Sequence, residues 1–141
     1  MVEFALATTI LFAMVFGILQ LSMALYSYHF TADAAREATR WAIVRGSLSC
    51  TNTPALNKCN ATTTDITNVV KSLGYPGIDP NQLTVTTTYR NPDNTLCTTA
   101  PCNLPGNSVQ VRVSYAFLLQ IPFSTSPLLH LGSTSMMTIS Q

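Results

Sequence analysis

Charged side chains are scarce in this chain. They make up 9% of its 141 residues, whereas an ordinary soluble domain has about 25%. The net charge is +1 and no block of basic residues occurs, so nothing favours binding to nucleic acid. The few acidic residues are too scattered along the sequence to form a cation cage. We therefore expect no nucleic-acid partner and no bound metal ion.

Catalytic and cofactor-binding motifs are missing too. The sequence has no glycine-rich phosphate loop, no HExxH pattern and no GxSxG pattern. His29 has no acid or nucleophile beside it in a recognisable motif, and its place after Tyr26 and Tyr28 is typical of a helix interface. We therefore expect a protein that is not an enzyme and that uses no cofactor.

The most prominent feature that is present is an apolar run from Phe4 to Tyr28, directly after Glu3. At 1.5 Å per helical residue, such a run is long enough to cross the hydrocarbon core of a bilayer, which is about 30 Å thick. It is too long for a signal peptide, no basic residue precedes it, and no convincing cleavage site lies near its end. We expect it to remain in the working molecule, held in lipid or against copies of itself.

The helix is predicted to continue beyond this run. Strong helix formers fill the next residues, and neither Gly nor Pro interrupts them before Gly46. Residues 1–46 are therefore predicted to form one long helix, apolar over 4–28 and amphipathic over 31–45. The first part resembles a stalk, and the second part can support a globular head.

All four cysteines follow the apolar run, as Cys50, Cys59, Cys97 and Cys102. An even number in a small domain behind a membrane-type segment predicts disulfides formed in an oxidising compartment. A zinc site is disfavoured because no CxxC pair occurs and both histidines lie outside the cysteine-bearing loops. Of the three pairings, we expect Cys50 with Cys59 and Cys97 with Cys102, because each bond then closes a short loop with little other means of order.

Residues 47–141 predict a small disulfide-bonded head. Apolar residues at helical spacing indicate a short helix at about 65–73, with Asp65 as its N-cap. Alternating apolar and polar residues indicate strands at about 83–90, 108–117 and 132–140, and the clearest alternation, at 108–117, is expected in the centre. The predicted fold class is α+β: a long N-terminal helix, a small antiparallel sheet and one short extra helix.

Two parts of the sequence resemble a known family. The specific part comprises the start Val2-Glu3-Phe4-Ala5-Leu6, the central Phe16-Gly17-Ile18 and the stretch ADAAREATR at 32–40. The looser part comprises Val-x-Val-x-Val-x-Tyr from Val109, Ile121-Pro122-Phe123 and a closing Ser/Thr/Met strand. Together they are similar to TadE-like pilins, in the tight-adherence branch of type IV pili. The resemblance covers residues 1–45 and 107–141, and it leaves out the middle with all four cysteines.

The resemblance implies a life cycle. A prepilin with a short basic leader is inserted in the inner membrane, clipped by a prepilin peptidase and extracted by the pilus assembly machinery. The product is a helical polymer of identical subunits, an extracellular filament on a bacterial cell surface. Because the family's glutamate usually stands a few residues after the cleavage point, this sequence is expected to be the mature form or to lack some residues at its start.

Glu3 is the one residue with an expected chemical task. A carboxylate at the head of an apolar helix would be costly to bury in a helix bundle unless a cation met it. The resemblance implies that this cation is the α-amino group of an adjacent subunit, so that the pair sets the axial register of the filament. The other reading is that Glu3 complements the N-terminus of its own helix.

Other residues are assigned to the filament by their place on the helix. Arg36, Glu37 and Arg40 could form contacts between subunits where the stalk meets the head, although a solvated helical face is the commoner explanation. Asn60-Ala61-Thr62 is a formal N-glycosylation triplet. The side chains expected in the filament core are Phe4, Leu6, Ile10, Leu11, Phe12, Val15, Phe16, Gly17, Ile18, Leu19, Leu21 and Leu25.

The sequence thus predicts a structural pilin subunit of a type IV-like, Tad-type filament used for surface attachment. Two alternatives stay open. The chain could be a minor pilin that primes or tips such a filament, or a membrane-anchored envelope protein whose head binds a ligand and never polymerises. Composition and spacing do not separate a major pilin from a minor one.

Overall fold

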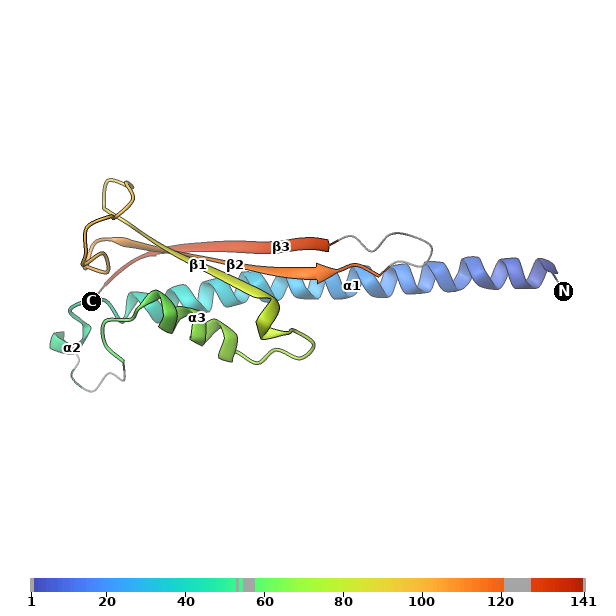
Figure 1. The fold of residues 1–141 in the computed structure, drawn as a ribbon, viewed down its shortest axis with the longest axis horizontal. Helices are drawn as coiled ribbons and strands as arrows, with labels where there is room; N and C mark the ends of the chain where they lie inside the picture. Colours follow the sequence, from blue (N-terminus) through green and yellow to red (C-terminus); the bar gives the residue numbers. More distant parts are fainter. Residues whose placement is uncertain (1, 53, 55–57, 121–127, 141) are drawn as a thin grey trace.

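The computed structural model describes residues 2–52, 54, 58–120 and 128–140. Its fold class is α+β, as predicted, with a long N-terminal helix, a three-stranded antiparallel sheet and short additional helices. Figure 1 shows that the sheet lies along the C-terminal half of the long helix, while the N-terminal half projects beyond the head. The molecule is therefore an elongated rod with a head at one end.

The long helix, α1, spans Val2–Ile43 and has 42 residues, which corresponds to a length of about 63 Å. It ends three residues before the predicted limit, because the chain turns after Ile43 and the Arg45 amide bonds the Ala42 carbonyl at 3.1 Å. The Arg45 guanidinium donates to the Trp41 carbonyl at 3.2 Å and lies 4.3 Å from the centre of the Trp41 ring. A cation thus covers a carbonyl group at the C-terminal end of the helix.

The sheet has the order β1-β2-β3, with β1 at Leu83–Arg90, β2 at Ser108–Leu118 and β3 at Leu128–Thr138. β2 lies in the centre and pairs antiparallel with both neighbours, as its alternation predicts. The prediction for β3 was wrong at both ends. It begins four residues earlier, because the ladder continues down to the pair Leu118–Leu128. It ends at Thr138 because Ile139 instead bonds the loop residue Asn107, whose carbonyl accepts from the Ile139 amide at 2.7 Å.

The short helix, α3, spans Thr63–Ser72, so it begins two residues before the predicted start. Its N-cap is Thr62, and Asp65 occupies the third helical position instead of the cap. The Asp65 amide donates to Thr62 Oγ1 at 3.2 Å, and the Thr62 amide donates to Asp65 Oδ2 at 3.1 Å. The two residues form a capping box, in which each side chain satisfies the backbone of the other. Two single-turn helices that the sequence did not predict are α2 at Ser49–Asn52 and the 3-10 helix η1 at Pro80–Gln82.

The core lies between the sheet and the C-terminal half of α1. One face of β2 is fully buried there, through Val109, Val111 and Val113. α3 adds the buried side chains Ile66 and Val70. α1 meets the sheet with one large residue and a series of small ones, which let the strands approach the helix closely: Phe30, Ala34, Ala35, Ala38 and Ala42.

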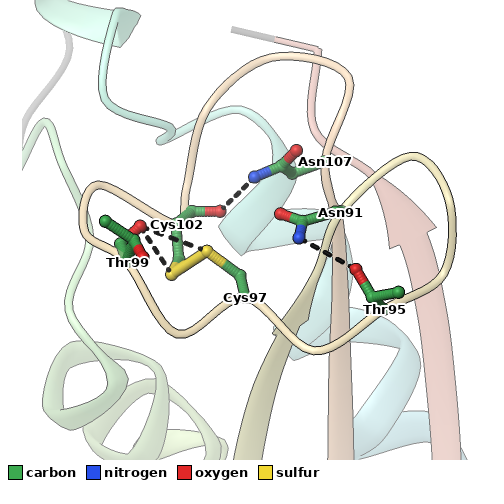
Figure 2. The surroundings of a disulfide bond; sticks show 6 residues. All are labelled: Asn91, Thr95, Cys97, Thr99, Cys102 and Asn107. Atoms are coloured by element: carbon green, nitrogen blue, oxygen red, sulfur yellow. Dashed lines mark hydrogen bonds between the residues drawn. A yellow bond between two sulfur atoms is a disulfide. The ribbon is translucent and has the colours of Figure 1, made fainter.

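Two disulfides close loops at the end of the head that is distant from the N-terminus. The structure joins Cys50 to Cys59 and Cys97 to Cys102, which is the local pairing expected from the sequence. Their Cα atoms lie 5.3 and 5.7 Å apart. Figure 2 shows the second bond, where the Thr99 carbonyl oxygen lies 3.4 and 3.5 Å from the two sulfur atoms and Asn107 Nδ2 donates to the Cys102 carbonyl at 2.9 Å. Each bond contributes about 2–3 kcal/mol if its loop behaves as a simple chain closure.

Candidate assembly surface

The N-terminal half of α1 is not covered by the head. Counting from Val2, the first buried residue of the helix is Ala24. Before it, Phe4 exposes 79% of its surface, Ile10 68% and Phe16 50%. This helix is the one in the described part of the chain that is long and apolar enough to cross a membrane. Because so large an apolar surface is unfavourable in water, another molecule must cover it.

The side chains expected in a filament core all lie on this uncovered surface. Each of them except Gly17 is an exposed large apolar residue, and together they surround the helix on every side. Gly17 is partly exposed, and a Cβ added to it would meet nothing within 4 Å. Among the described residues, no contact therefore requires a glycine there. The lack of a side chain would instead let a neighbouring helix approach closely.

The hydroxyl groups within the apolar run are bound by the helix itself. Thr8 donates to the Phe4 carbonyl at 2.8 Å, Thr9 to the Ala5 carbonyl at 2.8 Å and Ser22 to the Ile18 carbonyl at 2.9 Å. We did not assign this role to these residues from the sequence. The signal was available, because Ser and Thr inside a helix commonly bond the carbonyl four residues before. With these donors satisfied, the surface needs no water and no polar partner at these positions.

Glu3 lies in the first turn of α1, at the end of the rod opposite to the head, and is exposed (Figure 1). Among the described residues, no cationic side chain pairs with it. The structure thus places the carboxylate at the end of the apolar surface, beyond reach of the basic residues of its own head. Its expected pairing with a neighbouring subunit stays a prediction.

Charged residues line a hollow beside the C-terminal half of α1. Arg36 and Asp33 form an ion pair with an N–O distance of 3.7 Å, and their side chains are 66% and 61% exposed. An exposed pair of this kind contributes about 0–1 kcal/mol. The opposite wall comes from the end of α3 and the turn after it. The hollow has a volume of about 440 Å³ and is lined by Asp33, Arg36, Glu37, Arg40, Leu73 and Tyr75.

Asn60 lies on a loop beside the second disulfide. Its backbone is left-handed, with a φ of 57°, and its Oδ1 accepts from Asn103 Nδ2 at 2.6 Å. The Thr62 hydroxyl of the same triplet donates to Asp65 Oδ2 at 2.7 Å. N-glycosylation would modify Asn60 Nδ2, which neither of these two bonds uses, and Asn60 as a modified residue stays a prediction.

The same network sets the charge of Asp65. The hydrogen bonds from Thr62, together with the one from Lys58 Nζ at 3.0 Å, lower the pKa of Asp65 to about 2. The carboxylate is therefore ionised throughout the neutral and mildly acidic range.

Among the described residues, no group of three or more His, Cys, Asp or Glu side chains gathers where it could hold a metal ion.

Comparison with known proteins gives one match. Residues 1–40 match the model of the family described as TadE-like protein. The matched range contains Glu3, the whole uncovered part of α1 and most of its amphipathic part. No curated protein and no solved structure matches the chain. The match is consistent with a TadE-like, pilin-related protein and points to an association with Tad pili, and it leaves the head without a counterpart.

Proposed function

We propose that this chain is a structural pilin subunit, which polymerises through α1 into an extracellular, type IV-like filament used for surface attachment. One observation carries the proposal. The chain builds a complete core for its head and leaves the apolar half of α1 exposed on all sides. Copies of the same helix, packed side by side, would cover that surface.

The shape of the chain supports two successive environments for α1. From Phe4 to Leu25 the helix is about 33 Å long, close to the roughly 30 Å of a bilayer's hydrocarbon core. A single subunit can therefore reside in the inner membrane with its head outside. In the filament, neighbouring helices would replace the lipid, and the disulfide-bonded heads would lie on the outside. The match to the TadE-like family over residues 1–40 supports this reading, because it covers the helix that would enter both environments.

Glu3 is proposed to fix the register of this packing. A carboxylate carried into a bundle of apolar helices costs several kcal/mol unless a cation meets it. The α-amino group of an adjacent subunit is a cation at the corresponding end of the same kind of helix. Such a pair would select one axial offset between neighbours, and the apolar side chains would supply most of the assembly free energy.

The test is to image native material by negative-stain microscopy and to compare two single-carboxylate variants. Glu3→Gln removes the carboxylate at the end of the apolar surface, and the control Asp33→Asn removes a carboxylate on the same helix whose side chain is 61% exposed. We expect filaments from the parent chain and from Asp33→Asn, and few or none from Glu3→Gln.

Other outcomes would contradict the proposal in distinct ways. Normal filaments from Glu3→Gln would refute the register role alone. Short tip structures on filaments of another protein would favour the minor-pilin alternative. Detergent-bound single subunits without any fibre would favour a membrane-anchored protein whose head binds a ligand.

A further inference from the structure

The last pairs of the β2–β3 ladder carry exposed apolar side chains, and we call Leu118, Leu128 and Leu129 the hairpin end. Leu118 and Leu128 face each other in the ladder as its last pair, and they expose 48% and 54% of their surfaces. Leu129, next to them, exposes 42%. Neither residues 113–120 nor residues 128–138 contain an Asp, Glu, Lys or Arg. This end of the sheet is thus a leucine-rich surface without Asp, Glu, Lys or Arg, and the exposed His130 lies next to Leu129.

The leucine-rich end lies at the boundary between head and stalk. Figure 1 shows the tip of β2 and the start of β3 over the middle of α1, at the opposite end of the sheet from the disulfide loops. On α1 this boundary is marked by Ala24, the first buried residue. It is also marked by Tyr26, whose hydroxyl donates to the Pro76 carbonyl at 3.3 Å. This bond connects the helix to the turn that follows α3. The hairpin end and the turn around Pro76 therefore both face toward the uncovered half of α1.

The length of the apolar run fixes where this boundary would lie in a membrane. If Phe4 lies near one side of the hydrocarbon core, about 30 Å of helix brings the other side close to Leu25. Tyr26 and Tyr28 follow directly and are 45% and 47% exposed, as aromatic residues at a membrane interface commonly are. The leucine-rich end would then lie at the same depth, beside the headgroups.

We propose that in the membrane-bound subunit the hairpin end with Leu118, Leu128 and Leu129 inserts into the interfacial layer of the bilayer. The lipid surface is the occupant of this patch, and the proposal rests on the membrane stage of the function proposed above. Two features support it. The patch continues the apolar surface of α1 at the depth where that surface leaves the hydrocarbon, and it carries no Asp, Glu, Lys or Arg whose desolvation would oppose insertion.

This contact would give the head a fixed orientation on the membrane. A head attached by α1 alone could rotate and tilt freely, whereas a second apolar contact beside the helix holds the sheet against the bilayer. Extraction into a filament would then release two lipid contacts, the helix and the hairpin end.

The experiment measures the depth of single tryptophans in the full chain. Trp41→Phe removes the natural tryptophan, and Leu128→Trp then places one at the hairpin end. Leu96→Trp is the matched control, because Leu96 is also 54% exposed but lies in the loop after β1, at the distant end of the sheet. Phe16→Trp reports on α1, and Leu118→Trp replaces Leu128→Trp if that variant does not fold. Each variant is placed in two sets of phosphatidylcholine vesicles, one with phospholipids brominated near the headgroup end of the acyl chain and one with phospholipids brominated near its methyl end, because Phe16 would lie near the middle of the hydrocarbon core. A position counts as quenched if the bromine atoms of either set reduce its emission.

We expect the bromine atoms to quench at least half of the emission at position 128, with a shift to shorter wavelength, and to leave position 96 unaffected. If position 16 is quenched while 128 behaves like 96, the inference is wrong and the proposed function stands. If position 16 is also unquenched, the membrane stage of the proposed function fails with it. Shielding of position 128 in filaments but not in vesicles would identify a subunit contact and would likewise overturn the inference.

Discussion

Ile10→Ala tests whether the uncovered half of α1 is the surface that drives assembly. Burial of a whole isoleucine side chain contributes about 1.5–3 kcal/mol. In the single chain Ile10 is 68% exposed, so most of that contribution is still available to a neighbouring subunit. The truncation should therefore cost about 1–2 kcal/mol per subunit in the filament, which corresponds to a rise of about 5- to 30-fold in the subunit concentration needed for assembly.

The assay is pelleting of filaments over a range of subunit concentrations, with thermal unfolding in detergent as a second measurement. The thermal midpoint should not change, because Ile10 contributes nothing to the core of the head. Leu96→Ala is the control, since Leu96 is similarly exposed but belongs to the head. Assembly of Ile10→Ala at the parent concentration would refute the reasoning, as would an equal shift for Leu96→Ala.

Variants at two further positions test packing between helices, by filament yield, and stability of the head, by the thermal midpoint. Gly17→Leu should reduce filament yield by about 5- to 160-fold, since overpacking a helix contact costs about 1–3 kcal/mol. The subunit should keep its thermal midpoint because a Cβ there meets nothing within 4 Å. Gly17→Ala should have a smaller effect, and normal filaments from Gly17→Leu would show that no helix packs on that position. Asp65→Asn should lower the thermal midpoint of the subunit near neutral pH. The folded pKa of Asp65 is about 2, below its ordinary value of 3.8, so the contribution of the carboxylate is present above that ordinary value and is lost as the pH falls toward 2. Melting curves at several pH values should show the two proteins converging in acid, and a difference independent of pH would contradict the capping-box account.

The fold could be predicted where one physical pattern dominates. A long helix that has no Pro and a single glycine, Gly17, and a central strand whose apolar residues alternate toward one buried face, leave little choice of structure. The start of β3 was missed because its first residues, Leu128 and Leu129, are apolar without alternation. These two leucines are explained by the location of the hairpin end in the three-dimensional structure, and the sequence pattern does not reveal that location.

Local hydrogen bonding set the other limits of prediction. Thr62 and Asp65 are both good N-caps, and only the structure shows that the first caps α3 and the second completes the box. The single-turn helices α2 and η1 are too short to leave a periodic pattern. The composition of α1 predicts that the apolar residues of the candidate site form the core of a filament; the structure shows them uncovered in the single chain, and their place in a filament stays a prediction. The composition could not tell which side of the helix meets which neighbour, because an all-round apolar helix has no distinct face.

The two halves of α1 differ in the size of their side chains, and this difference explains how one helix can serve two cores. Small residues such as Ala34 and Ala38 bring the sheet close and are fully buried within the chain, whereas the large residues of the first half stay exposed because that half projects beyond the head (Figure 1). At the junction, Ser27 donates to the Met23 carbonyl at 2.9 Å and Thr31 to the Tyr28 carbonyl at 2.8 Å, so the change occurs without an unsatisfied group or a break in the helix. Because α1 is continuous through this point, a displacement of the stalk in a filament or a membrane must move the head with it.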